Sequence, residues 1–216
     1  MYGRPAVSIK GAFPTSLLGR RVMSDPSAGI RVRGGPVILN VNRLEPRKRV
    51  ALTIAAFEVF LRDHPDAILA IGGVGPSEPE LRALVEDRKL GQSVRFLGFI
   101  REFDLWDWLA TCDVFVHMNW AEFAIAPYEA LALGSNVVWS TEMELDPELA
   151  RYPHIFPSQP EPAALARQIT AALAAPRATP EQRQTLRVFS WEHYFAALEE
   201  IISVAIDPGA ERALPG

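Results

Sequence analysis

The chain has 216 residues, of which 49% are hydrophobic and 22% are charged, so it is long enough to bury a substantial core in one domain. Its formal net charge of −4 and pI near 5.6 argue against non-specific binding to nucleic acid or to an anionic membrane surface. The single cysteine, Cys112, excludes an internal disulfide, and its apolar neighbours predict a buried structural thiol. Because no stretch has the length of a membrane span or the apolar core of a signal peptide, we expect a cytoplasmic protein without transmembrane segments.

Short apolar runs alternate with helical patterns through the middle of the chain. The predicted strands cover residues 36–41, 67–72, 93–99, 113–118, 136–140 and, more weakly, 154–157. The predicted helices cover residues 49–64, 78–90, 101–112 and 124–134. The strands are apolar on both faces, as is typical of strands that helices cover on two sides. This alternation predicts the α/β class, with a doubly wound, Rossmann-like parallel sheet.

Two flanks fall outside this alternation. We expect residues 1–35, rich in Gly, Pro and Arg, to be a lead-in or linker, and residues 36–176 to form the Rossmann-like domain. Residues 177–216 are expected to hold a further helix and a loose tail. That helix is predicted to be amphipathic because four apolar residues share one face: Trp191, Phe195, Leu198 and Ile202.

Parallel sheets of this kind bind ligands outside the carboxyl ends of their strands, which draws attention to the loops at 42–48, 72–78, 98–103 and 119–125. The first loop, NRLEPRKR, gathers four cations just before a helix: Arg43, Arg47, Lys48 and Arg49. Cations there oppose the helix dipole, so helix stability does not explain them. A bound phosphate would explain them, and a solvated charged turn remains the alternative.

The second loop, GGVGPSEPEL, carries Gly73 and Gly75 but lacks the glycine fingerprint of dinucleotide-binding domains. That fingerprint needs a third small residue where this chain has Glu78. The difference disfavours an oxidoreductase with a dinucleotide cofactor. For the two glycines, a plain strand-to-helix turn is favoured over close approach to a ligand.

The fourth loop, NWAEFAIAPYEALALG, places Glu122 and Glu129 around a small-residue turn that opens a helix. The free N–H groups and dipole of such a turn attract an anion, which the carboxylates would repel. The conflict resolves if the ligand carries phosphates at one end and sugar hydroxyls at the other. Glu129, about one turn inside the helix, would then grip a vicinal diol such as ribose; a salt-bridged carboxylate is the alternative. His117, at the end of the preceding strand, is expected to be a hydrogen-bonded structural histidine.

Together these segments resemble the C-terminal, nucleotide-sugar-binding domain of the retaining GT-B glycosyltransferases of family 4, also called group 1. VILNVNRLEPRKRVALTIAAF is similar to that family's strand, R-L-x-x-x-K turn and helix. AILAIGGVGPSEPELRAL resembles its glycine turn, SVRFLGFI its V-x-F-x-G strand, and FAIAPYEALALGSNVVWS its F-G-I-x-P-x-E-A segment. The resemblance, which extends to FSWEHYFAALEEI near the C-terminus, implies a single GT-B half-domain.

The resemblance also implies roles for residues in these loops. Arg43 and Lys48 would hold the diphosphate of a nucleoside-diphosphate-sugar and support catalysis, and Glu129 would bind the ribose. The implied donor-binding residues are Arg43, Lys48, Gly73, Phe99, Ile100, Phe123, Ala124, Ile125 and Glu129. Among them, the amides near Ala124 and Ile125 would support the phosphates, and the base would pack near Phe99 and Ile100. The family needs no cofactor and no divalent metal, because fixed cations and the helix terminus neutralise the leaving group.

Two departures from the family pattern bear on function. The family's two glutamates are usually eight positions apart, whereas 129 − 122 gives seven here, and an ungapped alignment puts Ala121 at the first position. Glu122 would have to substitute as the catalytic group that touches the donor sugar. The acceptor-binding N-terminal domain is also absent from the chain. We therefore expect the donor-binding half of a retaining glycosyltransferase that works with an N-terminal acceptor domain or a partner chain; the alternative is a non-catalytic nucleotide-sugar-binding or scaffold module.

Overall fold

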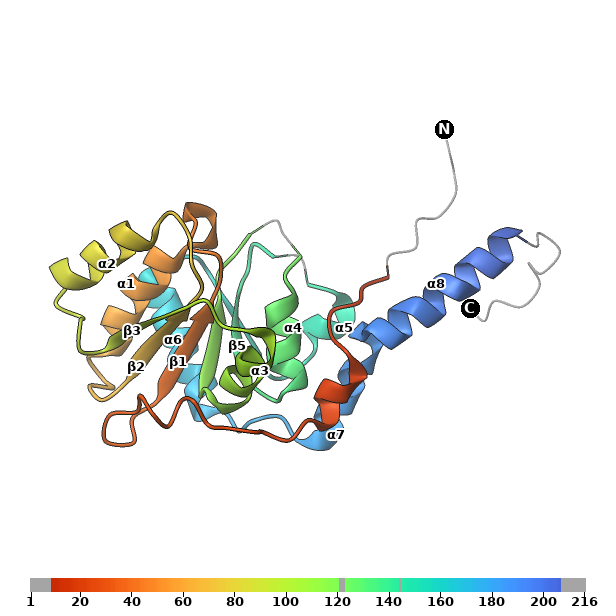
Figure 1. The fold of residues 1–216 in the computed structure, drawn as a ribbon, viewed down its shortest axis with the longest axis horizontal. Coiled ribbons are helices and arrows are strands. Elements are labelled where there is room, and N and C mark those ends of the chain that lie inside the picture. The colour runs from red at the N-terminus through yellow and green to blue at the C-terminus, as the bar shows by residue number, and fades with distance from the viewer. Residues whose placement is uncertain (1–8, 121–122, 144, 207–216) are drawn as a thin grey trace.

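The computed structural model describes residues 9–120, 123–143 and 145–206, which build a helix-covered parallel sheet (Figure 1). Every neighbouring pair of strands is parallel, and the order across the sheet is β3-β2-β1-β4-β5-β6. The strands are β1 Val37–Val41, β2 Ile68–Gly72, β3 Val94–Gly98, β4 Val114–His117, β5 Asn136–Ser140 and β6 Ile155–Ser158. The predicted doubly wound α/β fold is confirmed, and each strand lies within one or two residues of its predicted bounds.

The four predicted helices between the strands are also present. They are α1 Val50–Phe60, α2 Glu78–Asp87, α3 Glu102–Thr111 and α4 Ile125–Ala132. The remaining helices are α5 Pro147–Ala150, α6 Pro162–Ala174, α7 Pro180–Gln184 and α8 Trp191–Ile206, with 3-10 turns η1 Thr15–Gly19, η2 Pro46–Lys48 and η3 Thr185–Phe189. Helix α6 is not among the predicted helices, although its buried residues repeat with helical spacing: Leu165, Ala166, Ile169 and Ala172.

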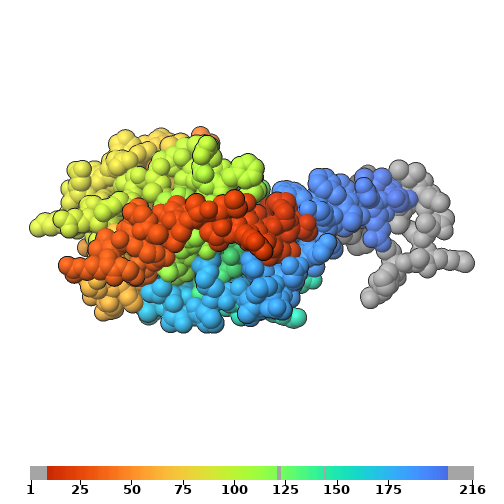
Figure 2. Space-filling model, turned by 60° about the horizontal axis from the view of Figure 1, so that its bottom comes forward, coloured from red at the N-terminus to blue at the C-terminus, as the bar shows by residue number. Residues whose placement is uncertain are grey.

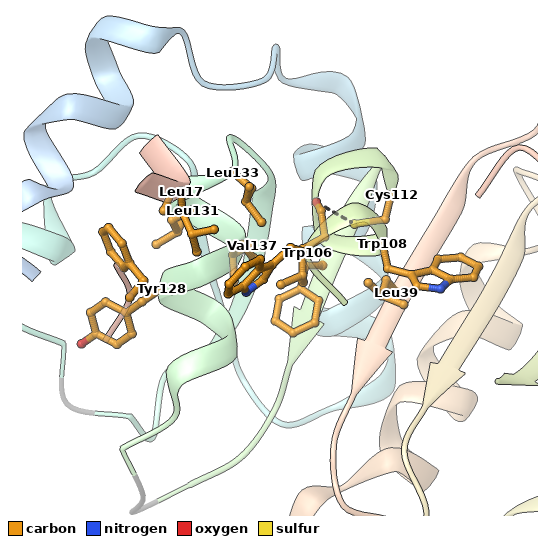
Figure 3. Close-up of a cluster of buried hydrophobic side chains, with 14 of the residues drawn as sticks. Leu17, Leu39, Trp106, Trp108, Cys112, Tyr128, Leu131, Leu133 and Val137 are labelled. Carbon is orange, nitrogen blue, oxygen red and sulfur yellow. Dashed lines mark hydrogen bonds between the residues drawn. The ribbon is translucent and has the colours of Figure 1, made fainter. Parts of the chain in front are cut away.

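The sheet separates two hydrophobic clusters, which explains why its strands are apolar on both faces. Along β1, Ile38 belongs to the cluster under α1, α2 and α6, whereas its neighbour Leu39 belongs to the cluster under α3 and α4. Figure 3 shows part of the second cluster, with Trp106 and Trp108 from α3 and Tyr128 from α4.

Cys112 lies in this second cluster, where its thiol contacts the Leu109 carbonyl oxygen at 3.6 Å (Figure 3). Burial raises the pKa of the thiol to about 12, so the reactive thiolate is strongly disfavoured at neutral pH. The prediction of a buried structural thiol is confirmed.

The described part of the lead-in packs on the domain rather than standing apart from it. Phe13 and Leu17 are fully buried in the second cluster. Phe13 also accepts a hydrogen bond from the Trp191 amide at 2.9 Å, which joins the lead-in to the start of α8. In Figure 2 the lead-in, in red and orange, runs across the surface of the sheet domain toward that helix.

Helix α8 projects away from the sheet domain (Figures 1 and 2). The predicted helix is therefore present, but most of its apolar face is open: Phe195, Ile201 and Ile202 are 55%, 38% and 47% exposed. Within the described ranges, no helix combines the length and apolar character needed to cross a membrane.

Candidate functional site

The strand order creates a switch point between β1 and β4. From β1 the chain continues to β2 and β3, which lie on one side of β1 within the sheet. It then crosses back to β4, which lies on the other side of β1. The loops that follow β1 and β4 therefore leave the same edge of the sheet from neighbouring strands. Open α/β sheets bind ligands in the crevice at such a point. This geometry brings together two of the four predicted loops, the basic loop after β1 and the loop that enters α4.

The basic loop contains one carboxylate, Glu45, which two of its four cations share. Glu45 forms one ion pair with Arg43 at 3.0 Å and another with Arg47 at 2.9 Å. The hydrogen bond from Arg47, together with the charges of this loop, lowers the pKa of the Glu45 carboxyl, so it stays ionised. Arg43 is 71% exposed at its side chain, whereas Lys48 is 8% exposed. The two predicted phosphate ligands thus differ sharply in burial.

The glycine loop after β2 supports the basic loop. A Cβ on Gly73 would lie 1.8 Å from the Asn42 carbonyl oxygen, and one on Gly75 would lie 2.4 Å from that of Leu44. The Leu44 amide also donates to the Val74 carbonyl at 3.1 Å. The close approach that these glycines permit is therefore to the neighbouring loop, which favours the structural turn over direct contact with a ligand.

Arg49 links the basic loop to the loops after β4 and β5. It ends the 3-10 turn η2 in a left-handed conformation with φ of 53° and precedes α1. Its guanidinium pairs with Glu142 at 2.5 Å and lies 5.9 Å from the centre of the Trp120 ring. These contacts hold the three loops around the switch point against one another.

The entrance of α4 has the form expected of an anion-binding helix terminus. Ala124 precedes the helix in an extended conformation, and no side chain of the described residues caps the first turn. The first turn also contains no acidic residue. Phe123 and Ile125 are about half exposed, at 48% and 43%, on either side of Ala124. Ala121 and the predicted catalytic residue Glu122 lie outside the described residues.

Glu129 is the predicted site residue that the structure buries most completely, at 7% exposure. Its Oε1 accepts a hydrogen bond of 2.9 Å from the indole Nε1 of Trp106 on α3. Burial, with a contribution from the Glu102 charge, raises the pKa of the Glu129 carboxyl, and the Trp106 bond offsets part of that rise. Arg43 and Glu129, both predicted site residues, have separate partners: Arg43 contacts Glu45, and Glu129 contacts Trp106.

Phe99 and Ile100 border a hollow of about 300 Å³ beside the start of α3. Its other lining residues are Ser24, Pro26, Leu97, Asp104 and Trp108. Phe99 is 75% exposed, and Ile100 packs toward the cluster under α3. The exposed Phe99 ring therefore offers a flat apolar surface beside a hollow that Ser24 and Asp104 make partly polar.

Two further residues belong to the site and are absent from the predicted set. Trp106 reaches Glu129 from another helix. Asn119, in the loop after β4, is 1% exposed, and neither polar atom of its amide has a hydrogen-bond partner among the residues that the structure describes. Asn119 could have been found because a polar residue that directly follows an apolar strand falls at the ligand-binding edge. His117, the residue that ends β4, is 2% exposed, which agrees with a structural role; the hydrogen bond expected for it stays a prediction.

Among the described residues, no group of three or more His, Cys, Asp and Glu side chains is placed to hold a metal ion. The features that do converge are an uncapped helix entrance, a basic loop and a buried carboxylate, all at a sheet switch point. They define the chain as an α/β domain with a candidate ligand-binding site at this edge of the sheet.

Comparison with known proteins identifies the family. The sequence profile of the family described as "Glycosyl transferases group 1" matches residues 28–187, and the chain belongs to this family. One relative is alpha-monoglucosyldiacylglycerol synthase from Acholeplasma laidlawii, 26% identical over 61% of this chain and 33% of its own length. Another is phosphatidyl-myo-inositol mannosyltransferase from Mycolicibacterium smegmatis, 34% identical over 50% of this chain and 28% of its own length. The matches span only 20% to 33% of the curated relatives' lengths.

Solved structures share the fold. Sucrose-phosphate synthase from Thermosynechococcus elongatus superposes with a TM-score of 0.75 at 22% identity, covering 92% of this chain and 52% of that one. HepE from Anabaena in complex with UDP-glucose superposes with a TM-score of 0.70 at 21% identity, covering 89% of this chain and 56% of that one. Both likenesses are likenesses of fold, and of these two structures the HepE structure contains UDP-glucose.

Proposed function

We propose that this chain is the donor-binding half of a retaining glycosyltransferase, which transfers a sugar from a nucleoside-diphosphate-sugar to an acceptor held by another domain or chain. The observation that carries the proposal is the position of Glu129, which is buried one turn inside the uncapped entrance of α4, the helix that follows β4 at the switch point. One ligand can satisfy both the amides and the carboxylate if it carries phosphates next to a ribose. Family membership and UDP-bound structural neighbours support the same ligand class.

Each part of the donor has a matching group. Arg43 and Lys48 bind the diphosphate together with the amides near Ala124 and Ile125. Glu129 accepts hydrogen bonds from the ribose hydroxyls, and the base lies against Phe99 and Ile100. Gly73 serves by holding the basic loop in shape.

In the transfer step, the bond between the anomeric carbon and the diphosphate oxygen breaks, and the diphosphate leaves with the electron pair. The acceptor hydroxyl forms the new bond on the same face of the sugar and passes its proton to the departing diphosphate oxygen. Arg43, Lys48 and the entrance of α4 stabilise the charge that develops on the leaving diphosphate, so no divalent metal is required. Glu122, which lies outside the described residues, is the catalytic group proposed to act on the donor sugar. The transfer takes place in the cytoplasm.

Calorimetric titration with UDP and GDP tests the proposal, using wild type and the variants Lys48→Ala and Arg43→Ala. A lost hydrogen bond to a charged group is worth about 1.5–3 kcal/mol, so affinity for at least one of the two nucleotides should fall roughly ten- to a hundredfold. Arg62→Ala is the matched control, because Arg62 follows the far end of α1, at the opposite edge of the sheet. Equal affinities of wild type and Lys48→Ala would remove Lys48 from the site.

A second candidate is a non-catalytic nucleotide-sugar-binding or scaffold module. Two observations favour it: Ala121 stands where the family carries its first glutamate, and Arg43 is already paired with Glu45. The two candidates differ in turnover. Release of UDP or GDP from a nucleotide-sugar, by this chain together with its acceptor domain or partner chain, would exclude the module; tight binding without turnover would favour it.

A further inference from the structure

The Trp106 side chain joins α3 to the carboxylate of Glu129. Its indole Nε1 donates to Oε1 at 2.9 Å, and both residues are buried, at 8% and 7% exposure. An indole has a single N–H donor, whereas an ionised carboxylate accepts through two oxygens. No other hydrogen bond to the Glu129 carboxylate is made by the described residues. The bond therefore fixes one oxygen and leaves acceptor capacity for a ligand.

The indole is itself held from two sides. The Arg20 guanidinium lies 5.1 Å from the centre of the Trp106 ring, and the Phe103 ring meets it edge-on with centroids 5.2 Å apart. These contacts restrict the direction in which the indole N–H points.

Arg20 is in turn fixed through Asp107, the residue after Trp106 on α3. Asp107 accepts from the Arg20 guanidinium at 3.2 Å, from the amides of Met23 and Ser24 at 3.2 and 3.0 Å, and from the Ser24 hydroxyl at 2.9 Å. Burial raises the pKa of the Asp107 carboxyl, but these bonds lower it by more, so the carboxylate stays ionised and keeps its donors. The lead-in thus anchors the ring that orients Glu129.

We propose that Trp106 is a positioning residue for donor recognition, whose indole N–H holds the Glu129 carboxylate in the orientation that accepts hydrogen bonds from the ribose hydroxyls of a nucleoside diphosphate. This inference rests on the proposed function. Trp106 does not touch the donor; it acts through Glu129. A carboxylate fixed in advance spends less conformational entropy when the diol binds.

The test is Trp106→Phe, which keeps an aromatic ring and removes the N–H. Titrations use UDP and GDP with their 2′,3′-dideoxy forms, which lack both ribose hydroxyls. We expect Trp106→Phe to bind the ribonucleotide about five- to tenfold more weakly and the dideoxy form with unchanged affinity. Trp191→Phe is the control, because Trp191 lies at the start of α8 and packs against Gly11 and Tyr194, and it should change neither affinity.

A double-mutant cycle with Glu129→Gln shows whether Trp106 acts through Glu129. Under the proposal, adding Trp106→Phe to Glu129→Gln weakens ribonucleotide binding by less than twofold, because the residue it positions has already lost its charge. Full additivity would overturn the inference. Tighter binding by Trp106→Phe alone would also overturn it, since the indole would then be a competitor of the ribose.

Wild-type protein provides a measurement that does not depend on the folding of a variant. The Trp106 indole N–H should stay protected from hydrogen exchange when UDP or GDP is bound, and loss of protection would overturn the inference.

Failure of the proposed function is recognised separately. If wild type binds ribonucleotides and dideoxynucleotides equally, or binds neither, Glu129 is not a ribose ligand and both proposals fall; if wild type discriminates and Trp106→Phe matches it, only the inference falls.

Discussion

The two sides of the candidate site differ in how they are prepared for a ligand. Glu129 is buried and held by an indole that other residues fix in turn. Arg43 is exposed and shares Glu45 with Arg47, so its charge is compensated in part. Under the proposed function, the ribose side is thus preorganised, whereas on the diphosphate side the ligand competes with an internal ion pair. We infer that ribose recognition depends on fixed packing and that phosphate recognition depends on competition between charges.

The largest expected effect comes from the backbone that shapes the phosphate side. Gly73 has φ of +117°, and a Cβ there would meet the Asn42 carbonyl oxygen at 1.8 Å, so Gly73→Ala should destabilise the fold by on the order of 3 kcal/mol. Gly91→Ala is the control, since nothing lies within 4 Å of its Cβ position. Denaturant unfolding compares the two variants. Equal stabilities of the two variants would mean that the basic loop can move to make room for the added methyl group. The difference between the two sides of the site would then depend only on the ion pair between Arg43 and Glu45.

Glu129→Gln probes the preorganised side and should produce opposite changes in binding and stability. Affinity for ribonucleotides should fall roughly tenfold or more, because a charged acceptor is lost. Burial raises the pKa of Glu129 in the folded state above its ordinary value of 4.5. At pH values between 4.5 and this raised pKa, the folded state therefore holds more protons than the unfolded state. Wild-type stability should therefore fall, relative to the variant, as pH rises through that window.

Unfolding of wild type and Glu129→Gln across a pH series measures this difference. Glu86→Gln, an exposed change on α2, controls for the loss of one negative charge. A wild-type advantage that grows with pH would contradict burial as the dominant influence on Glu129.

Glu45→Gln probes the phosphate side and should have the smallest effect. Releasing Arg43 from its carboxylate partner should strengthen UDP or GDP binding by about threefold at low salt, since exposed ion pairs contribute little. The gain should shrink as ionic strength rises. Titration at two salt concentrations, with Glu86→Gln as the control, measures it. Weaker binding by Glu45→Gln would mean that Glu45 shapes the loop instead of competing with the ligand.

The sequence predicts the sheet well because strands that are buried on both faces consist of short, continuous apolar runs. Ile38 and Leu39 point into different clusters, and a run of such residues reads as a covered strand. The same alternation places the four predicted loops at the carboxyl ends of the strands, where we propose that the ligand binds. Helix α6 could have been predicted too, from the spacing of Leu165 and Ile169.

The contacts inside the site could not be predicted in the same way. Trp106 and Glu129 are 23 residues apart on different helices, and their hydrogen bond depends on how α3 and α4 pack. The glycine loop shows the intermediate case. Its composition predicts a turn that needs glycine, but only the fold reveals that Gly73 faces the Asn42 carbonyl.

The structure of this chain with bound UDP or GDP tests the central claim most directly. The account predicts the diphosphate between Lys48, Arg43 and the amides at the entrance of α4, with the ribose hydroxyls on Glu129 and the Trp106 bond intact. A nucleotide bound away from the β1 and β4 loops, or with its ribose turned away from Glu129, would contradict the account.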